Sequence, residues 1–268
     1  MSKTTNQQTT KVRHTLSNKP TLLFVVLGAF FVCNAIIAEF IGVKIFAFEK
    51  TVGIPSLDWD LFGHKGSLSL SAGVLLWPVV FIMTDIINEY YGKRGVKLLS
   101  YIGVGMISYA FFMIYGAIHL VPADFWVGSY TNQGVPDMQI AFATIFGQGA
   151  WIIVASIIAF LVGQLIDAFI FHQLRKMTKD KKVWLRATGS TVVSQFIDSF
   201  LVLSIAFVLG PPQWSMSLFL AVGTVNYIYK FLVAVFLTPL IYLAHHLIDN
   251  FLGKDLAATM KARASLEG

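Results

Sequence analysis

Six apolar stretches of about 20 residues dominate this 268-residue chain and limit what it can fold into. They cover approximately residues 21–43, 69–87, 98–120, 150–171, 189–209 and 218–243. A transmembrane helix needs about 20 mainly apolar residues, because each residue adds about 1.5 Å towards a hydrocarbon core about 30 Å thick. A membrane β-barrel would instead show alternating segments of about 10 residues. We therefore expect an all-α integral membrane protein with six transmembrane helices.

The composition excludes several other classes of protein. Only 13% of the residues are charged, whereas a soluble domain carries roughly 25%. The single cysteine, Cys33, excludes an internal disulfide and a cysteine-rich metal site. The sequence has no phosphate-binding loop of the Walker type, so the chain is not expected to hydrolyse ATP. We expect no cofactor and no metal.

The basic residues predict the orientation of the chain. Sixteen of the 20 Lys and Arg residues fall in the N-terminal segment, in two alternate loops and after the last span. Because such residues gather on the cytoplasmic side, both termini are predicted to be cytoplasmic. The net charge of +6 is then a topology signal, and no nucleic-acid partner is expected.

The chain divides into a cytoplasmic tail (1–20), a six-helix transmembrane domain (21–250) and a second cytoplasmic tail (251–268), whose last residues, Ser-Leu-Glu-Gly, resemble a cloning remnant. Between the spans, residues 45–66 alternate apolar and polar residues around glycines and a proline, which favours a small hairpin cap. Residues 138–146 form an apolar run that is too short to cross, so we expect it at the interface or as a re-entrant segment.

Several polar residues lie where lipid-facing residues are expected. In chain order they are Asn34, Glu39, Asp85, Asn88, Glu89, Gln164, Asp167, Gln195, Asp198, Asn226 and Lys230. A charge in the middle of the membrane costs at least about 2.5–3.5 kcal/mol, so such residues pack inward, pair or serve a function. Purely structural roles stay open: an ion pair between Asp198 and Lys230, solvated helix ends at Glu39 and Asp167, and a helix contact at Asn226.

One local pattern occurs in two spans. Gln164 precedes Asp167, and Gln195 precedes Asp198, by three residues, which places each pair on one helix face. A carboxylate can accept from adjacent N–H and NH₂ groups while an amide donates to a carbonyl. These groups can together bind a guanine-like edge, and Trp77 offers a face for ring stacking.

Three motifs resemble the queuosine precursor transporter family, which is also described as a vitamin-uptake-type family. They are Thr84-Asp-Ile-Ile-Asn-Glu-Tyr-Tyr-Gly-Lys-Arg94, Ser190-Thr-Val-Val-Ser-Gln-Phe-Ile-Asp-Ser-Phe200 and Asn226-Tyr-Ile-Tyr-Lys230. The resemblance implies import of 7-cyano- and 7-aminomethyl-7-deazaguanine across the bacterial inner membrane. It also implies a fold similar to the substrate-binding components of energy-coupling-factor transporters. The matching candidates for substrate binding are Asp85, Asn88, Glu89, Gln195, Asp198, Asn226 and Lys230, whereas Asn34, Glu39, Trp77, Gln164 and Asp167 rest on placement alone.

Other functions stay open at this point. The main alternative is a transporter of another nucleobase-like molecule or vitamin. An intramembrane hydrolase with Asp167 and Asp198 as its acids is disfavoured because the two lie at different depths, so we expect no enzyme. Proton coupling, an ATP-driven partner and facilitated diffusion all stay open, although Ala29, Ala35 and Ala38 do not form the four-residue repeat that would favour docking on such a partner. A homo-oligomer is also open.

Overall fold

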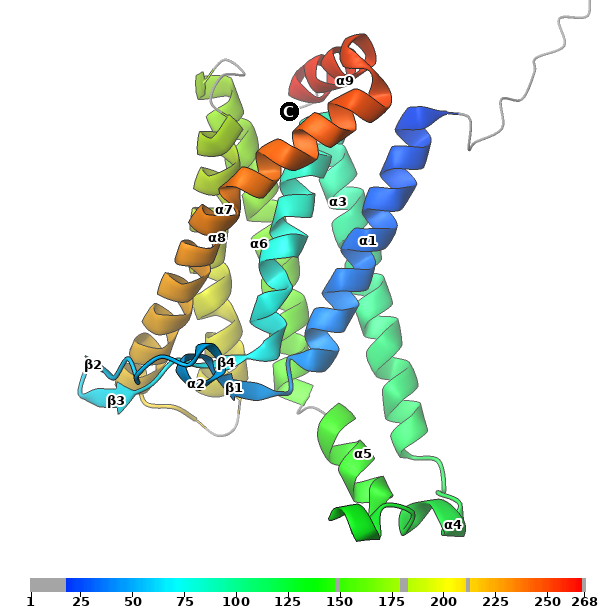
Figure 1. Cartoon of the computed structure of the whole chain (residues 1–268), viewed down its shortest axis with the longest axis vertical. Coiled ribbons are helices and arrows are strands. Elements are labelled where there is room, and N and C mark those ends of the chain that lie inside the picture. The colour runs from blue at the N-terminus through cyan, green and yellow to red at the C-terminus, as the bar shows by residue number, and fades with distance from the viewer. Residues whose placement is uncertain (1–17, 148–149, 179–182, 211–212, 267–268) are drawn as a thin grey trace, which may run out of the picture.

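The protein is an all-α membrane protein in which long apolar helices form a bundle (Figure 1). The structure, a computed structural model of the whole chain, describes residues 18–147, 150–178, 183–210 and 213–266. Within these residues, five helical segments are long and apolar enough to cross a membrane. They are built from α1 (Lys19–Ile41), α3 (Trp77–Ile118), α6 (Ala150–Thr178), α7 (Val183–Leu203, continued by a π-helical turn at Ser204–Leu209) and α8 (Met216–Leu252).

Helix α3 contains two of the six predicted spans, because it turns sharply at Gly92. This glycine has φ 67° and ψ −174°, a backbone conformation that essentially only glycine adopts. Residues 77–91, the first arm, run in the same direction as α6, since Thr84 contacts Gln164 and Asn88 contacts Ala168.

Residues 93–118, the second arm of α3, run in the opposite direction. Leu99 packs on Gly28 of α1, and Gly103, further along, packs on Phe31, so this arm runs parallel to α1. Gly103 also contacts Phe160 of α6. Figure 1 shows the chain rising in the first arm and descending in the second. The second arm corresponds to the predicted stretch 98–120.

Strands lie at one end of the bundle, which we call the strand end. Here β1 (Ile45–Ala47) pairs antiparallel with β4 (Ser69–Ser71), and β2 (Trp59–Leu61) pairs antiparallel with β3 (His64–Gly66). In the chain, α2 (Phe48–Val52) follows β1. A short 3-10 helix (Ala72–Leu75) follows β4 and leads into α3. The predicted hairpin is confirmed for 59–66, where Phe62 and Gly63 both have positive φ, as a two-residue type I′ turn requires. The prediction that 69–71 belong to a span is wrong, because their backbone pairs with β1.

Three further helical segments follow the second arm at the strand end: α4 (Asp124–Val127), a 3-10 turn (Thr131–Gln133) and α5 (Met138–Phe146). The nine residues of α5 are the apolar run that is too short to cross. Figure 1 shows α4 and α5 beyond the lower end of α3.

The opposite end of the bundle, which we call the terminal end, carries the start of α1 and the last helix (Figure 1). Within the predicted C-terminal tail, Lys254–Leu266 form helix α9. Ala257 and Ala264 of α9 are buried, and Ala264 lies against the Gly92 turn. The small side chains on this face let α9 pack closely against α3. The hydropathy of so short a segment does not predict a packed helix.

Candidate functional site

A small pocket lies between the first arm of α3, α7 and α8. Its polar lining consists of Asp85, Thr188, Thr191, Gln195 and Lys230. Its apolar lining consists of Pro78, Phe81, Ile82, Ala234, Leu237 and Ile241. Three of the residues that the sequence singles out, Asp85, Gln195 and Lys230, are therefore brought together from three helices.

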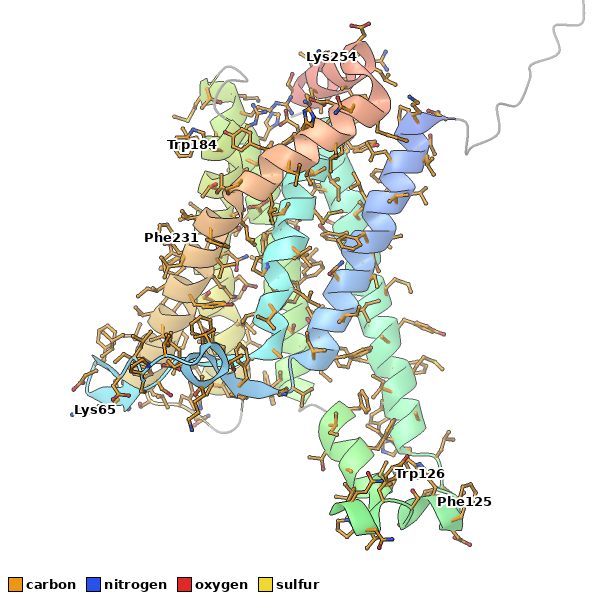
Figure 2. The ribbon with its side chains drawn as sticks, in the orientation of Figure 1. Lys65, Phe125, Trp126, Trp184, Phe231 and Lys254 are labelled. Atoms are coloured by element: carbon orange, nitrogen blue, oxygen red, sulfur yellow. The ribbon has the colours of Figure 1, made fainter. Side chains whose placement is uncertain are left out.

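The pocket lies deep within the bundle. Figure 2 shows Phe231 of α8 between Lys65 at the strand end and Lys254 at the terminal end, roughly midway along the bundle. Lys230 is the adjacent residue, so its charge lies far from both ends. The cavity holds about 20 Å³, which is enough for one water. A bicyclic ring would require the surrounding helices to move apart.

An ion pair borders this pocket. Lys230 Nζ lies 2.5 Å from Asp198 Oδ2, and the two side chains are 9% and 17% exposed. The lysine reaches from α8 to α7, where Asp198 is one helical turn beyond Gln195. The cost of placing a cation at this depth is thereby offset by a close counter-charge.

Gln195 is the pocket residue with a free hydrogen-bonding group. Its side chain is 4% exposed, and its Nε2 has no hydrogen-bond partner among the described residues. A buried donor without an acceptor destabilises a protein by about 1–3 kcal/mol. Such a group is typical of a site where a ligand supplies the missing acceptor.

A layer of buried polar groups adjoins the pocket. Ser190 and Thr191 of α7 each donate to Asp85 over 3.4 Å. Ser194, one turn further on, donates to Asp167 of α6 over 3.1 Å. Asp85 and Asp167 are 1% and 0% exposed. Two predicted candidates from different helices are thus connected by a row of hydroxyls on α7.

Gln164 and Asn88 hold α3 against α6. Thr84 donates to Gln164 Oε1, and Asn88 Nδ2 donates to the carbonyl of Ala168 over 3.3 Å. Both side chains are buried, and neither lines the pocket. Their contacts join α3 to α6, although Gln164 Nε2, like Gln195 Nε2, has no hydrogen-bond partner among the described residues.

Glu89 lies one turn beyond Asp85 but points to a different group of partners. Arg186 Nη2 lies 2.6 Å from Glu89 Oε1, and Arg175 Nη2 lies 3.8 Å from the same atom. Arg175 also donates to the carbonyl of Lys261 in α9 over 2.6 Å. This cluster joins α3, α6, α7 and α9 at the terminal end, away from the pocket lining.

The candidates on α1 also lie outside the pocket. Glu39 accepts a hydrogen bond from Ser156 of α6, and Asn34 donates to the carbonyl of Phe30 in its own helix over 2.8 Å. Two further candidates, on α3 and α8, also lie outside the pocket lining. The ring of Trp77, at the start of α3, lies 5.5 Å from the Phe160 ring of α6. Asn226 of α8 lies one turn before Lys230 but does not line the pocket.

Sequence reasoning missed Thr188, Thr191 and Phe81. Thr191 could have been found, because it precedes Gln195 by four residues and therefore shares its helix face. Phe81 likewise precedes Asp85 by four residues and shares its helix face. Neither Thr191 nor Phe81 is charged, so neither was recognised as unusual within a membrane span.

No group of three or more His, Cys, Asp or Glu side chains suited to a metal ion occurs in the described part of the chain. Asp167 and Asp198 do not form an acid pair, since they bond to Ser194 and Lys230 respectively. The pocket offers a carboxylate acceptor at Asp85, a buried amide donor at Gln195, two threonine hydroxyls and the ammonium group of Lys230.

Comparison with known proteins decides the family. Residues 71–244 match the family described as "Putative vitamin uptake transporter", and every residue lining the pocket falls within this range. The chain belongs to this family. Its match to the family covers both arms of α3, helices α6 and α7 and most of α8, and supports a multi-pass membrane transporter.

Several relatives of this member of the vitamin uptake transporter family have names that specify a substrate class. A "Probable queuosine precursor transporter" of Bacillus subtilis is 28% identical over 193 residues, which are 71% of this chain and 76% of the relative. The "Queuosine precursor transporter" of Escherichia coli is 26% identical over 189 residues, 69% and 75% of the two chains. A third relative, from Haemophilus influenzae, is 23% identical over 168 residues, 62% and 63% of the two chains. No solved structure is significantly similar to the chain.

Proposed function

We propose that this protein imports queuosine precursors of the 7-deazaguanine type, the 7-cyano and 7-aminomethyl forms, across the bacterial inner membrane. The observation that carries the proposal is the pocket in which Asp85, Gln195 and Lys230 meet at mid-depth. The names of the Bacillus subtilis and Escherichia coli relatives support the substrate class, and this chain covers about three quarters of each relative. The chain then moves its substrate without changing it chemically.

The pocket chemistry suits this substrate. A deazaguanine keeps a ring N–H and an NH₂ group next to a carbonyl. In our proposal the carboxylate of Asp85 accepts from the two donors, and the free Nε2 of Gln195 donates to the carbonyl. Phe81 offers a ring face for stacking.

The proposed topology has six crossings, with both termini in the cytoplasm. The two arms of α3 run in opposite directions, so each arm serves as one crossing. The strand end carries Lys44, Lys50 and Lys65, whereas the terminal end carries basic residues from several described segments: Lys19, Lys93, Arg94, Arg175, Lys176, Arg186, Lys254, Lys261 and Arg263. This distribution supports a cytoplasmic terminal end.

Transport requires that the pocket open alternately to the two sides. Its volume of about 20 Å³ is far below that of a bicyclic ring, so α8 and α7 must move relative to the first arm of α3. A likeness to the substrate-binding components of energy-coupling-factor transporters stays a prediction.

Equilibrium binding to the purified protein tests the proposal. Labelled 7-cyano-7-deazaguanine should bind saturably, and unlabelled 7-aminomethyl-7-deazaguanine should displace it. A vitamin such as riboflavin should not displace it at similar concentrations. Displacement by the vitamin but not by either deazaguanine would favour the alternative, a vitamin transporter.

A further inference from the structure

We propose that Asp85 and Asp167, connected through the hydroxyls of Ser190, Thr191 and Ser194, form a proton-binding site that couples import to the proton gradient. This inference rests on the proposed function. The ligand of the site is a proton that enters together with the substrate.

The two carboxyls face one short stretch of α7 and have no described counter-charge. Both are almost fully buried; Ser190 and Thr191 lie 3.4 Å from Asp85, and Ser194 lies 3.1 Å from Asp167. Among the described residues, neither carboxyl forms an ion pair with a basic side chain. Two ionised carboxylates in such a place would each lack a counter-charge, which destabilises the doubly ionised form. One proton shared by the pair removes this cost.

The neighbouring cations are already paired with other acids. Arg175 and Arg186 contact Glu89, and Lys230 contacts Asp198. On α9, Lys261 lies 2.8 Å from Asp249 of α8. On α1, Glu39 contacts Ser156. Other buried titratable groups among the described residues of these helices are Tyr90 of α3, His172 of α6 and His245 of α8.

The hydrogen bonds of the hydroxyls also favour a bound proton. Ser190 Oγ lies 3.0 Å from the carbonyl of Ala187 and 3.4 Å from Asp85. Ser194 Oγ lies 3.1 Å from the carbonyl of Thr191 and 3.1 Å from Asp167. Each hydroxyl has one proton and cannot donate to both acceptors. A protonated Asp167 would donate to the Ser194 oxygen, which leaves the serine proton for the carbonyl of Thr191 and satisfies both contacts of Ser194. Asp85, which stays ionised, still accepts from Thr191 over 3.4 Å.

Independent observations connect the pair to the substrate pocket. Asp85 lines the same cavity as Gln195, a 4% exposed side chain whose Nε2 has no partner among the described residues. Asp167 Oδ2 is likewise buried and has no described partner. With the proton on Asp167, Asp85 is ionised and can accept from the ring N–H and NH₂ groups of the substrate. Substrate and proton therefore favour each other's binding.

The test is proton movement in proteoliposomes that contain the full chain and a pH-sensitive dye. The probe is 7-cyano-7-deazaguanine, which carries no cationic group of its own. Its addition outside should acidify the lumen, and an acid-outside gradient of one pH unit should raise accumulation by up to about tenfold. The affinity of the purified protein for the probe should fall as the pH rises.

A variant separates coupling from binding. Asp167→Asn should abolish the acidification and the pH dependence of binding, whereas Asp60→Asn, in an exposed strand-end pair, should change neither. If Asp167→Asn does not fold, the wild-type measurement alone decides. Exchange of the probe without proton movement, or driven by sodium ions, would overturn the coupling and leave the proposed function intact. Absence of binding and exchange of any deazaguanine would overturn both.

Discussion

Lys230 of α8 lies 2.5 Å from Asp198 of α7, and this ion pair joins two helices beside the candidate pocket. The two residues are separated by 32 positions in the chain. The pair joins two of the three helices that line the pocket and so holds α7 and α8 together beside it.

Asp198→Asn should reduce uptake by at least tenfold. The substitution leaves Lys230 without its counter-charge, and breaking a buried pair costs about 3–5 kcal/mol. Uptake and thermal stability in detergent should be measured together. The double variant Asp198→Asn/Lys230→Met should recover most of the stability without recovering uptake, because it removes both charges. Normal uptake by Asp198→Asn would contradict a role of the pair in transport.

Gln195→Leu should separate stability from binding. Its Nε2 has no partner among the described residues, so replacing the amide by an apolar group of similar size should leave the melting temperature unchanged or higher. Binding of 7-cyano-7-deazaguanine should weaken about three- to tenfold, since one hydrogen bond contributes about 0.5–1.5 kcal/mol. The exposed Gln133→Leu is the matched control. Unchanged affinity in Gln195→Leu would remove this residue from the site.

Gly92→Ala should destabilise the protein by about 1–3 kcal/mol, because its φ of 67° with ψ −174° suits glycine only. A Cβ there would also lie 3.2 Å from the carbonyl oxygen of Ala264 and disturb α9. Gly105→Ala is the control in the same helix, where a Cβ would meet nothing within 4 Å. Thermal unfolding in detergent distinguishes the two. Equal stability of both variants would show that the reversal of α3 does not depend on Gly92.

The strand end should lose stability at acid pH through Glu49. Its Oε1 accepts from the backbone N–H of Leu68 over 2.7 Å and from that of Leu57 over 3.4 Å. The bond from Leu68 is the main cause that lowers the pKa of this carboxyl. Because the folded pKa is below the unfolded value of about 4.3, the stabilisation is complete above that pH and is lost as the pH falls through the folded pKa.

Hydrogen exchange of peptides covering residues 57–68, corrected for intrinsic rates, measures this loss between pH 3 and pH 6. Protection should fall at the acid end in the wild type. Glu49→Gln should be less protected at pH 6 and should show little change with pH, whereas Asp60→Asn should follow the wild type. Constant protection in the wild type would contradict the role of Glu49.

The spans could be predicted from the sequence because crossing a membrane sets a minimum apolar length. The polar residues inside them could also be recognised, since each is costly in lipid. Their partners could not: Glu89 contacts Arg186, which is 97 positions away, and this depends on which helix faces meet. The reversal between the stretches 69–87 and 98–120 was implied by the two predicted spans, but its position at Gly92 was not. The same limit hid the packing of α9, whose buried residues are Ala257 and Ala264.

Uptake by cells tests the central claim most directly. Cells that lack both precursor synthesis and their own importer should accumulate labelled 7-cyano- or 7-aminomethyl-7-deazaguanine only when they express this protein. We predict protein-dependent, saturable uptake that is reduced at least tenfold by Asp198→Asn at equal membrane abundance. No protein-dependent uptake of either compound, with the protein shown to be in the membrane, would contradict the account.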